Sequence, residues 1–237
     1  MTILIATRNL HKVREIRTCL GEGFHFLTLL DYPDAPTTID DQPTFAGNAS
    51  KKATELAVWV QQCTDLRECT FVLADDSGLE VDALGGAPSV YSARFAALDT
   101  GGPGNSTDAD NNAKLLRLLA GLPPEQRTAR FRCVIALDLA RPRPFAQESP
   151  CGSSPNGPVP TPALFEGVCE GRILDAPRGQ SGFGYDPLFL PNGYAQTFAE
   201  LGEETKNQIS HRAQALQRLR QWLVASQKLA PSIRVAG

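Results

Sequence analysis

Three short clusters of polar residues in this chain could bind or hydrolyse a phosphorylated ligand. The first is the segment TRNLHK at 7–12, which directly follows the apolar run TILIA. A hydroxyl, an amide, a lysine and the free N–H groups of a helix start would together suit a group of anionic oxygens such as a polyphosphate. A capped helix with solvated charges would have the same residues, and the cluster alone does not separate the two interpretations. The sequence has no GxxxxGK(S/T) phosphate loop.

The second cluster is Asp75, Asp76, Ser77 and Gly78, which follow the apolar segment 71–74. This segment predicts a short strand that ends at the carboxylates. Neighbouring residues of a strand point to opposite sides, so we expect one carboxylate to meet a metal and the other to fix the turn. Mg²⁺ prefers one or two carboxylates together with substrate phosphates, which fits this sparse arrangement. An aspartate-rich turn without a metal is the alternative.

The third cluster consists of the segments GFGYDP at 182–187 and SHR at 210–212. The glycines would expose Phe183 and let a ligand approach the backbone, while Asp186 could accept hydrogen bonds from the edge of a base. An aromatic face with His211 and Arg212 as donors would form a purine pocket. The alternative is that Phe183 and Tyr185 are core aromatics under a tight turn.

Alternating strand and helix patterns along the chain would position these clusters. Apolar or alternating segments predict strands at 2–6, 71–74, 130–140 and about 164–169. Apolar residues at helical spacing predict helices, one beginning after an Asn9 cap and others at 48–62, 108–120 and 210–224. The alternation is typical of the α/β class, in which ligands bind where the strands of an open sheet end.

The composition describes a protein that can bury a full hydrophobic core, in one large domain or two small ones. Of the 237 residues, 42% are hydrophobic and 21% are charged, and the net charge is −3. This charge gives no electrostatic reason to expect nucleic-acid binding. No run of about 18 apolar residues predicts a membrane span, and the N-terminus lacks the apolar stretch of a secretion signal. We therefore expect a cytoplasmic protein that binds neither nucleic acid nor membrane.

Two other features of the sequence concern the scaffold. The six cysteines form no CxxC pair and the three histidines are scattered, so we expect buried free thiols rather than disulfides or a zinc site. Between Pro142 and Pro162 there are seven prolines in 21 residues. Such a segment holds neither sheet nor helix, and it predicts an extended or disordered insert loop at 141–163.

Six segments, which occur in family order, resemble the inosine triphosphate pyrophosphatase family. They are TRNLHKVREI (7–16), TFAGNASKKA (44–53), LADDSGLEVDALGGAPSVYSARF (73–95), FRCVIAL (131–137), GFGYDPLF (182–189) and KNQISHRAQAL (206–216). Members of this family are Mg²⁺-dependent enzymes that hydrolyse non-standard purine nucleoside triphosphates (ITP, dITP and XTP) to the monophosphate and pyrophosphate. The resemblance implies the same reaction here, which would cleanse the nucleotide pool, with Mg²⁺ as cofactor.

The resemblance also implies an architecture and an assembly. The expected fold has a mixed central sheet flanked by helices, in an elongated, two-lobed single domain over residues 1–237. The active site would lie in the cleft between the lobes. The family pairs through a surface that includes segments like GGAPSVYSARF at 85–95, which implies a homodimer.

Carried over by position, the resemblance assigns roles to particular residues. Asp76 would bind the metal and act as the general base, with Asp40 as the second metal carboxylate. Lys12 and Lys52 would be the other catalytic residues, because they face the triphosphate. The substrate-binding residues would be Thr7, Arg8, Asn9, Leu10, His11, Lys12, Ser77, Phe183, Gly184, Tyr185, Asp186, Lys206, His211 and Arg212. The guanidinium of Arg212, or a protonated His211, would donate to the 6-keto oxygen of the base.

The chain departs from the family pattern near the metal site, and two other functions fit parts of the sequence. It has Asp40-Asp41 where family members often have two glutamates, and Gly47 where they have a glutamate. Pyrophosphatases of modified pyrimidine or thymidine triphosphates share the fold and the opening turn, but GFGYDP and SHR match the purine-reading family. A non-catalytic nucleotide-binding module is the other alternative, against which the intact Asp76 and the two lysines argue.

Overall fold

The computed structural model describes residues 1–102, 104–140 and 162–229, and it contains a six-stranded sheet with the order β2-β1-β3-β4-β5-β6. The strands are β1 (Thr2–Ile5), β2 (His25–Thr28), β3 (Cys69–Val81), β4 (Thr128–Leu139), β5 (Ala163–Ile173) and β6 (Phe189–Pro191). The α-helices are α1 (Leu10–Leu20), α2 (Phe45–Gln62), α3 (Asp108–Leu118), α4 (Phe198–Ile209) and α5 (His211–Leu229). The sheet is mixed, because β1 runs parallel to β2 and β3 whereas the other neighbours are antiparallel.

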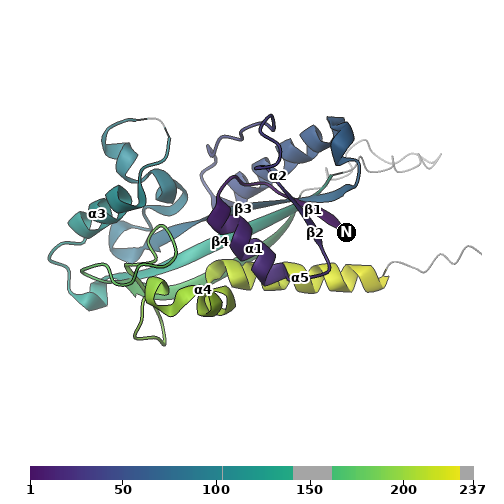
Figure 1. The fold of residues 1–237 in the computed structure, drawn as a ribbon. Helices are drawn as coiled ribbons and strands as arrows, with labels where there is room; N and C mark the ends of the chain where they lie inside the picture. The colour runs from purple at the N-terminus through teal and green to yellow at the C-terminus, as the bar shows by residue number, and fades with distance from the viewer. Residues whose placement is uncertain (103, 141–161, 230–237) are drawn as a thin grey trace, which may run out of the picture.

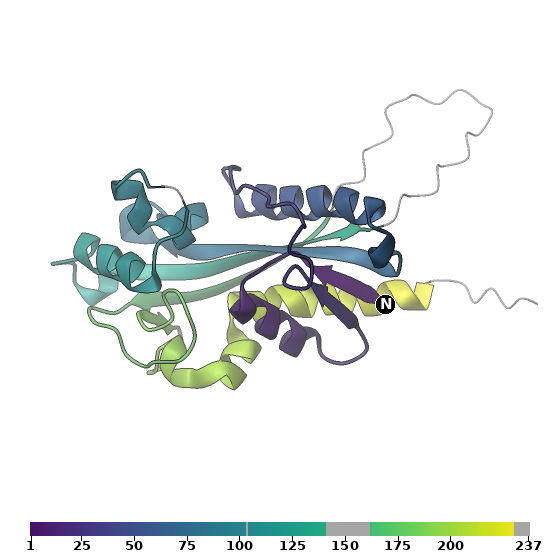
Figure 2. The ribbon, with the colours of Figure 1, turned by 45° about the horizontal axis from the view of Figure 1, so that its top comes forward.

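Helices cover both faces of the sheet, and the longest strands project beyond them (Figure 1). α2 packs on one face, and α1 and α5 pack on the other (Figure 2). β3 and β4 continue past these layers into a second lobe, which is built from α3 and short 3₁₀ helices and which we call the α3 lobe (82–102 and 104–126). The predicted α/β class, with a mixed sheet flanked by helices in an elongated, two-lobed molecule, is confirmed.

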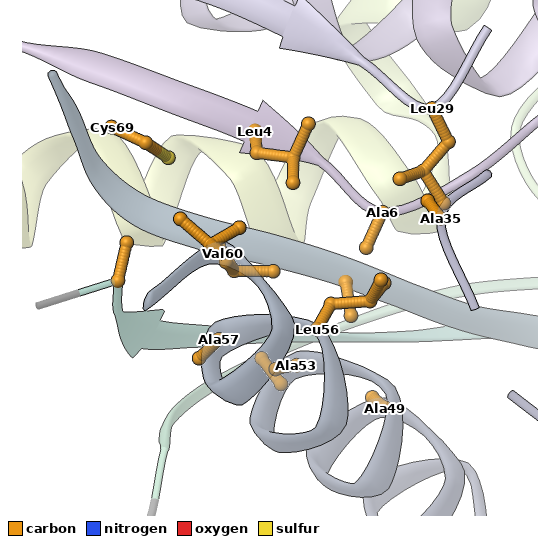
Figure 3. Close-up of a cluster of buried hydrophobic side chains, with 14 of the residues drawn as sticks. Leu4, Ala6, Leu29, Ala35, Ala49, Ala53, Leu56, Ala57, Val60 and Cys69 are labelled. Carbon is orange, nitrogen blue, oxygen red and sulfur yellow. The ribbon is translucent and has the colours of Figure 1, made fainter. Parts of the chain in front are cut away.

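The face of α2 that meets the sheet is made of small and medium apolar residues at helical spacing (Figure 3). Its buried members include Ala49, Ala53, Leu56 and Val60. Alanines let the helix approach the strands closely, and the larger side chains fill the remaining space. Burying one leucine of this kind contributes about 2 kcal/mol. This packing fixes α2, and with it the side chain of Lys52, against the sheet.

The prediction that the strand before the second cluster stops at Ala74 is wrong, because β3 continues for seven more residues to Val81. β4 pairs with β3 through this whole stretch, with Asp75 opposite Ile135 and Asp76 opposite Val134. Aspartates are normally depleted in sheets, but here both pair with cations, Asp75 with Lys12 and Arg212 and Asp76 with Lys52. The two carboxylates therefore lie in mid-strand, where they face opposite sides of the sheet.

The remaining elements follow the sequence patterns with shifts at their ends. α2 begins at Phe45, three residues earlier than predicted, because Thr44 Oγ1 caps it by accepting a hydrogen bond from the N–H of Gly47 at 3.0 Å. The sequence patterns did not predict β2, β6 or α4. The start of α4 nevertheless has a recognisable signal, a capping box formed by Thr197 and Glu200.

Several scaffold predictions have a partial outcome. Five cysteines in the described ranges are free thiols, as predicted: Cys19, Cys63, Cys69, Cys133 and Cys169. Of the predicted insert loop at 141–163, residues 141–161 lie outside the described residues. No helix in the described part of the chain is long and apolar enough to cross a membrane.

Candidate active site

The first turn of α1 presents main-chain donors at the edge of the sheet, directly after β1. Asn9 is the N-cap, and its Oδ1 accepts hydrogen bonds from the N–H groups of His11 at 2.9 Å and Lys12 at 3.2 Å. Thr7 Oγ1 accepts a hydrogen bond from the N–H of Asn9 at 3.1 Å. Thr7, Asn9 and Lys12 line a cavity of about 370 Å³. A helix N-terminus with a nearby lysine favours an anion in such a cavity.

Another wall of this cavity holds two carboxylates around one ammonium group. Lys52 Nζ lies 2.8 Å from Asp40 Oδ1 and 3.0 Å from Asp76 Oδ1. Asn48 Nδ2 donates a hydrogen bond to Asp76 Oδ2 at 3.1 Å. Burial raises the pKa of the Asp76 carboxyl, and the charge of Asp40 acts in the same direction, although Lys52 opposes both. A carboxylate with a raised pKa is a better proton acceptor than an ordinary aspartate.

Asp40 and Asp76 have the chemistry of a Mg²⁺ site that is completed by a ligand. The ammonium of Lys52 lies within ion-pair distance of both, so a single cation can meet both carboxylates. Two carboxylates together with phosphate oxygens are a donor set that Mg²⁺ takes. Within the described ranges, no group of three or more His, Cys, Asp or Glu side chains could hold a metal. The neighbouring Asp41 does not belong to the site, because it pairs with Lys51 at the surface at 2.8 Å.

On the opposite face of β3, Asp75 pairs with two cations. One is Lys12, and the other is Arg212, whose Nε lies 2.9 Å from Asp75 Oδ2. Burial alone would raise the pKa of Asp75, but Arg212 and Lys12 hold it well below its usual range. The Oγ of Ser77 also donates to Asp75, at 3.0 Å. Asp75 is therefore a permanent charge that positions cations and not a proton acceptor.

Glu15 joins this arrangement to the other end of the site, although its sequence context predicts only a helix surface. Its carboxylate pairs with Arg212, and its Oε1 lies 2.9 Å from Lys206 Nζ. Lys206 Nζ in turn lies 2.6 Å from Asp186 Oδ2. Glu15 follows Lys12 by three residues, so a shared face of the helix was the available signal. We call these six alternating charges, from Lys12 to Asp186, the buried ionic chain.

His211 and Arg212 begin α5. Both are buried, and both line a second cavity of about 190 Å³. A guanidinium has five N–H groups, and four hydrogen bonds from Arg212 to neighbouring side chains leave one N–H for a ligand. Burial lowers the pKa of His211 well below its usual range, and the charges of Arg212 and Lys206 add to this effect. A neutral His211 is therefore expected, which favours Arg212 over a protonated His211 as the donor to a ligand. A neutral imidazole still has one donor and one acceptor.

The ring of Phe183 lies at the side of this second cavity. It stacks on His11 with 5.1 Å between ring centroids, and Lys206 Nζ lies 4.5 Å from its centroid. The Asp186 carboxylate fixes the loop by accepting a hydrogen bond from the N–H of Phe183 at 2.9 Å. Gly182 has a φ of +81°, and a Cβ there would also collide with the Asp186 carboxylate. Only glycine therefore suits this turn.

The α3 lobe holds the same loop from the other side. Asp108 Oδ2 accepts a hydrogen bond from the N–H of Gly184 at 2.6 Å, and Asn112 Nδ2 donates to the Gly184 carbonyl at 3.0 Å. Tyr185 donates its hydroxyl to the carbonyl of Ser92 at 2.9 Å. Gly184 and Tyr185 thus position the loop through these bonds. No local sequence signal identifies Asp108 or Asn112, because their partner is more than 70 residues away.

Three of the residues predicted to bind substrate do not have that role as their main contact. Arg8 lines the larger cavity, but its Nη2 donates to the carbonyl of Ala35 at 2.7 Å and stabilises the loop before α2. Leu10, which is 53% exposed, and His11, which stacks on Phe183, line neither of the two cavities.

The two cavities meet, and together they form one elongated site. Asn9, Lys12 and Ser77 line both, as do Ala93 and Asn105 from the α3 lobe. The smaller cavity therefore has an aromatic ring and buried donors, and the larger one has lysines and carboxylates. A ligand with a flat base at one end and several phosphates at the other would match this division.

Relatives of known sequence cover almost all of the chain. The model of the Ham1 family matches residues 3–222. A dITP/XTP pyrophosphatase of Geobacillus kaustophilus is 46% identical over 222 residues, which is 93% of each chain. A dITP/XTP pyrophosphatase of Shouchella clausii is 43% identical over 219 residues, covering 92% of this chain and 94% of the relative.

Solved structures show the same fold. The Ham1 protein of Staphylococcus aureus is 32% identical with a TM-score of 0.72, covering 95% of this chain and 100% of that one. The nucleoside-triphosphatase or dITP/XTP pyrophosphatase of Mycobacterium abscessus is 35% identical with a TM-score of 0.64, covering 92% and 98%. A family match over nearly the whole chain, relatives at more than 40% identity and a shared fold together show that this chain belongs to the Ham1 family.

Proposed function

We propose that this chain hydrolyses non-standard purine nucleoside triphosphates (ITP, dITP and XTP) to the monophosphate and pyrophosphate. The observation that carries the proposal is the joining of the two cavities at Asn9, Lys12 and Ser77. This junction allows one nucleotide to meet both the Phe183 loop and the carboxylates around Lys52. The names of the pyrophosphatase relatives support the same reaction.

In this proposal the phosphates lie against the first turn of α1, and Mg²⁺ is held by Asp76 and Asp40. When bound, the ion would neutralise and orient phosphate oxygens. Lys12 and Lys52 neutralise further charge as pyrophosphate leaves. Both lysines already pair with carboxylates, so they are held in place before the substrate arrives.

The proton step is assigned to Asp76. Water attacks the α-phosphorus, Asp76 accepts the proton, and the bond to the pyrophosphate group breaks. The raised pKa of the Asp76 carboxyl makes it a more effective base for this step. No covalent intermediate is needed, and each atom of the water ends on the monophosphate or on the carboxylate.

The base would be selected by hydrogen bonds in the smaller cavity. Inosine and xanthosine have a 6-keto acceptor, which suits the remaining N–H of Arg212 and the N–H of neutral His211. Adenine would present an amino donor to these donors, leaving buried polar groups unpaired at a cost of roughly 1–3 kcal/mol each. Guanine keeps the keto group, so its 2-amino group must be rejected. Xanthine has an oxygen of similar size at the same position, so we assign this rejection to the donor character of the amino group and not to its size.

The decisive experiment measures release of monophosphate and pyrophosphate from ITP, XTP, GTP, ATP and a modified thymidine triphosphate, with and without Mg²⁺. We expect the highest kcat/KM for ITP and XTP, and almost no turnover after Mg²⁺ is removed with a chelator. A preference for the thymidine compound would favour the pyrimidine alternative. Tight nucleotide binding without turnover would favour a non-catalytic module.

The assembly and the domain organisation rest on the family resemblance, and the location rests on the sequence features described above. We propose a cytoplasmic homodimer in which each chain forms a single domain over 1–237. The net charge of −3 gives no support for a nucleic-acid partner.

A further inference from the structure

The charged residues that line the larger cavity belong to three groups, which differ in how far their charges are balanced. The first is the buried ionic chain, in which three cations alternate with three carboxylates. It has no net charge. Its cations are held by neighbouring carboxylates, so a bound anion would have to compete with those carboxylates for them.

The second group is Lys52 with Asp40 and Asp76. One cation between two carboxylates leaves one net negative charge, which suits a divalent metal ion. This group does not supply positive charge to a triphosphate unless a metal is bound.

The third group is Arg8 and Arg94, which line the same cavity. Arg8 donates to main-chain carbonyls, and Arg94 Nη2 donates to the carbonyl of Asp40 at 2.7 Å. The guanidinium of Arg94 also lies 5.1 Å from the ring centroid of Tyr91. Across the described ranges neither arginine forms an ion pair with a carboxylate, so both keep a full positive charge at the cavity.

A nucleoside triphosphate with bound Mg²⁺ has about two net negative charges. The two arginines supply two positive charges, and no other group lining the cavity has a surplus. Arg8 belongs to the opening turn, whereas Arg94 ends the 3₁₀ helix Ser89–Arg94 in the α3 lobe and lies far from that turn in the sequence.

We propose that Arg94 is a phosphate-binding residue contributed by the α3 lobe. Its Nη2 holds the main chain of Asp40 next to the metal carboxylate, and its remaining N–H groups bind triphosphate oxygens. A guanidinium suits this double task because its planar fork has donors in fixed directions. The identity of the substrate, a nucleoside triphosphate, rests on the proposed function. The binding of a polyphosphate anion by Arg94 does not.

The test uses the full-length protein and a probe without a base. Isothermal titration with tripolyphosphate in the presence of Mg²⁺ is carried out on the wild type and on Arg94→Gln, which can keep the bond to Asp40 but loses the charge. We expect tripolyphosphate to bind at least about 10-fold more weakly and kcat/KM for ITP to fall about 100-fold. Binding of the nucleoside inosine, which has no phosphate, should be unchanged.

Arg117→Gln is the matched control, because Arg117 belongs to the same lobe, pairs with Asp99 at the surface and does not line the cavity. If Arg94→Gln did not fold, the same binding measurements would be made on Arg94→Met, which keeps a long unbranched side chain without the charge. Unchanged tripolyphosphate affinity would overturn the proposal, and so would an equal loss of inosine and tripolyphosphate binding. Failure of the wild type to hydrolyse ITP would instead contradict the proposed function and leave the tripolyphosphate result valid.

Discussion

Two adjacent aspartates show how strongly position decides the behaviour of the same side chain. Asp75 and Asp76 are both buried, and burial disfavours the charge of each. Asp75 touches two cations and keeps its charge, whereas Asp76 shares one lysine with Asp40 and its pKa is raised. Because of this electrostatic difference, Asp75 acts as a positioning residue, whereas Asp76 is the proposed base.

We expect Asp76→Asn to keep the fold and to lose at least about 100-fold in kcat with ITP, because the amide can neither accept the proton nor hold Mg²⁺ as well. Steady-state kinetics and circular dichroism would measure the two effects. Asp41→Asn, which removes a surface carboxylate one residue from Asp40, is the control. A folded Asp76→Asn protein with turnover near wild type would exclude the proposed role.

The neutral His211 predicts how stability depends on pH. Its folded pKa lies well below 6.5 because of burial and nearby cations, so below pH 6.5 the unfolded chain binds a proton that the folded chain does not. The contribution of His211 to the free energy of unfolding is therefore complete above pH 6.5. It is lost as the pH falls towards the pKa of His211 in the folded chain. Urea unfolding at pH 7 and pH 5 should show that the free energy of unfolding decreases less in His211→Asn than in the wild type. His25→Asn, at an exposed histidine, should behave like the wild type.

Residue roles could be predicted from sequence only where a motif carries them. The opening turn, Asp76 and the Phe183 loop lie in recognisable segments, and the structure brings most of them to one site. Glu15 has only its helical spacing from Lys12 as a signal, and Asp108 has none, because each acts on residues that are distant in the sequence. Arg212 was identified as a donor, but its four hydrogen bonds to side chains depend on the fold.

At the scale of elements, the close contact between β5 and α5 positions His211. A Cβ on Gly167 would collide with the carbonyl of His211 and lie 2.6 Å from the N–H nitrogen of Ala215. The absence of a side chain at Gly167 therefore lets the start of α5 approach the sheet. The hydrophobic periodicity of α5 predicts the helix, but it does not predict how closely the start of the helix packs against β5.

We expect Gly167→Ala to destabilise the fold by about 1–3 kcal/mol or more, because main-chain atoms of α5 would have to move. Thermal unfolding would show the loss, and selectivity for ITP over ATP should fall as His211 and Arg212 are displaced. Gly102→Ala is a suitable control, since a Cβ there would meet one hydroxyl at 3.4 Å. Equal melting temperatures for the two variants would contradict the close-packing argument.

Element boundaries were predictable where caps mark them and unpredictable where pairing decides them. Asn9 caps α1 as its sequence position predicts. The end of β3 was missed because the aspartates indicate a turn when they are considered locally, whereas β4 and nearby cations hold them in the sheet. Short edge strands such as β2 and β6 have too few residues for a periodic pattern.

At the scale of the whole molecule, the family resemblance predicts a dimer. The segment 85–95 in the α3 lobe includes Tyr91, which is 45% exposed and could be covered by a partner. Light scattering should give a mass near twice 25.6 kDa over a wide concentration range. A mass near that of one chain at all concentrations would contradict the prediction.

The connection between β4 and β5 should be replaceable. Leu137 pairs with Ala163, so the two strands are already adjacent where residues 141–161 join them, and a short Gly-Ser linker could span the gap. We expect a melting temperature within a few degrees of the wild type, because shortening a loop changes its closure entropy only slowly. A large decrease would show that the replaced residues stabilise the fold.

The opposite faces of β3 on which Asp75 and Asp76 lie have a consequence for how this gene can change length. Inserting or deleting one residue between Cys69 and Asp75 would move every following side chain to the other face. The carboxylate that anchors Arg212 and the one that faces Lys52 would then exchange sides, and both ends of the site would fail together. We expect sequence variation within this strand to consist of substitutions alone, and length variation to be confined to connections between elements.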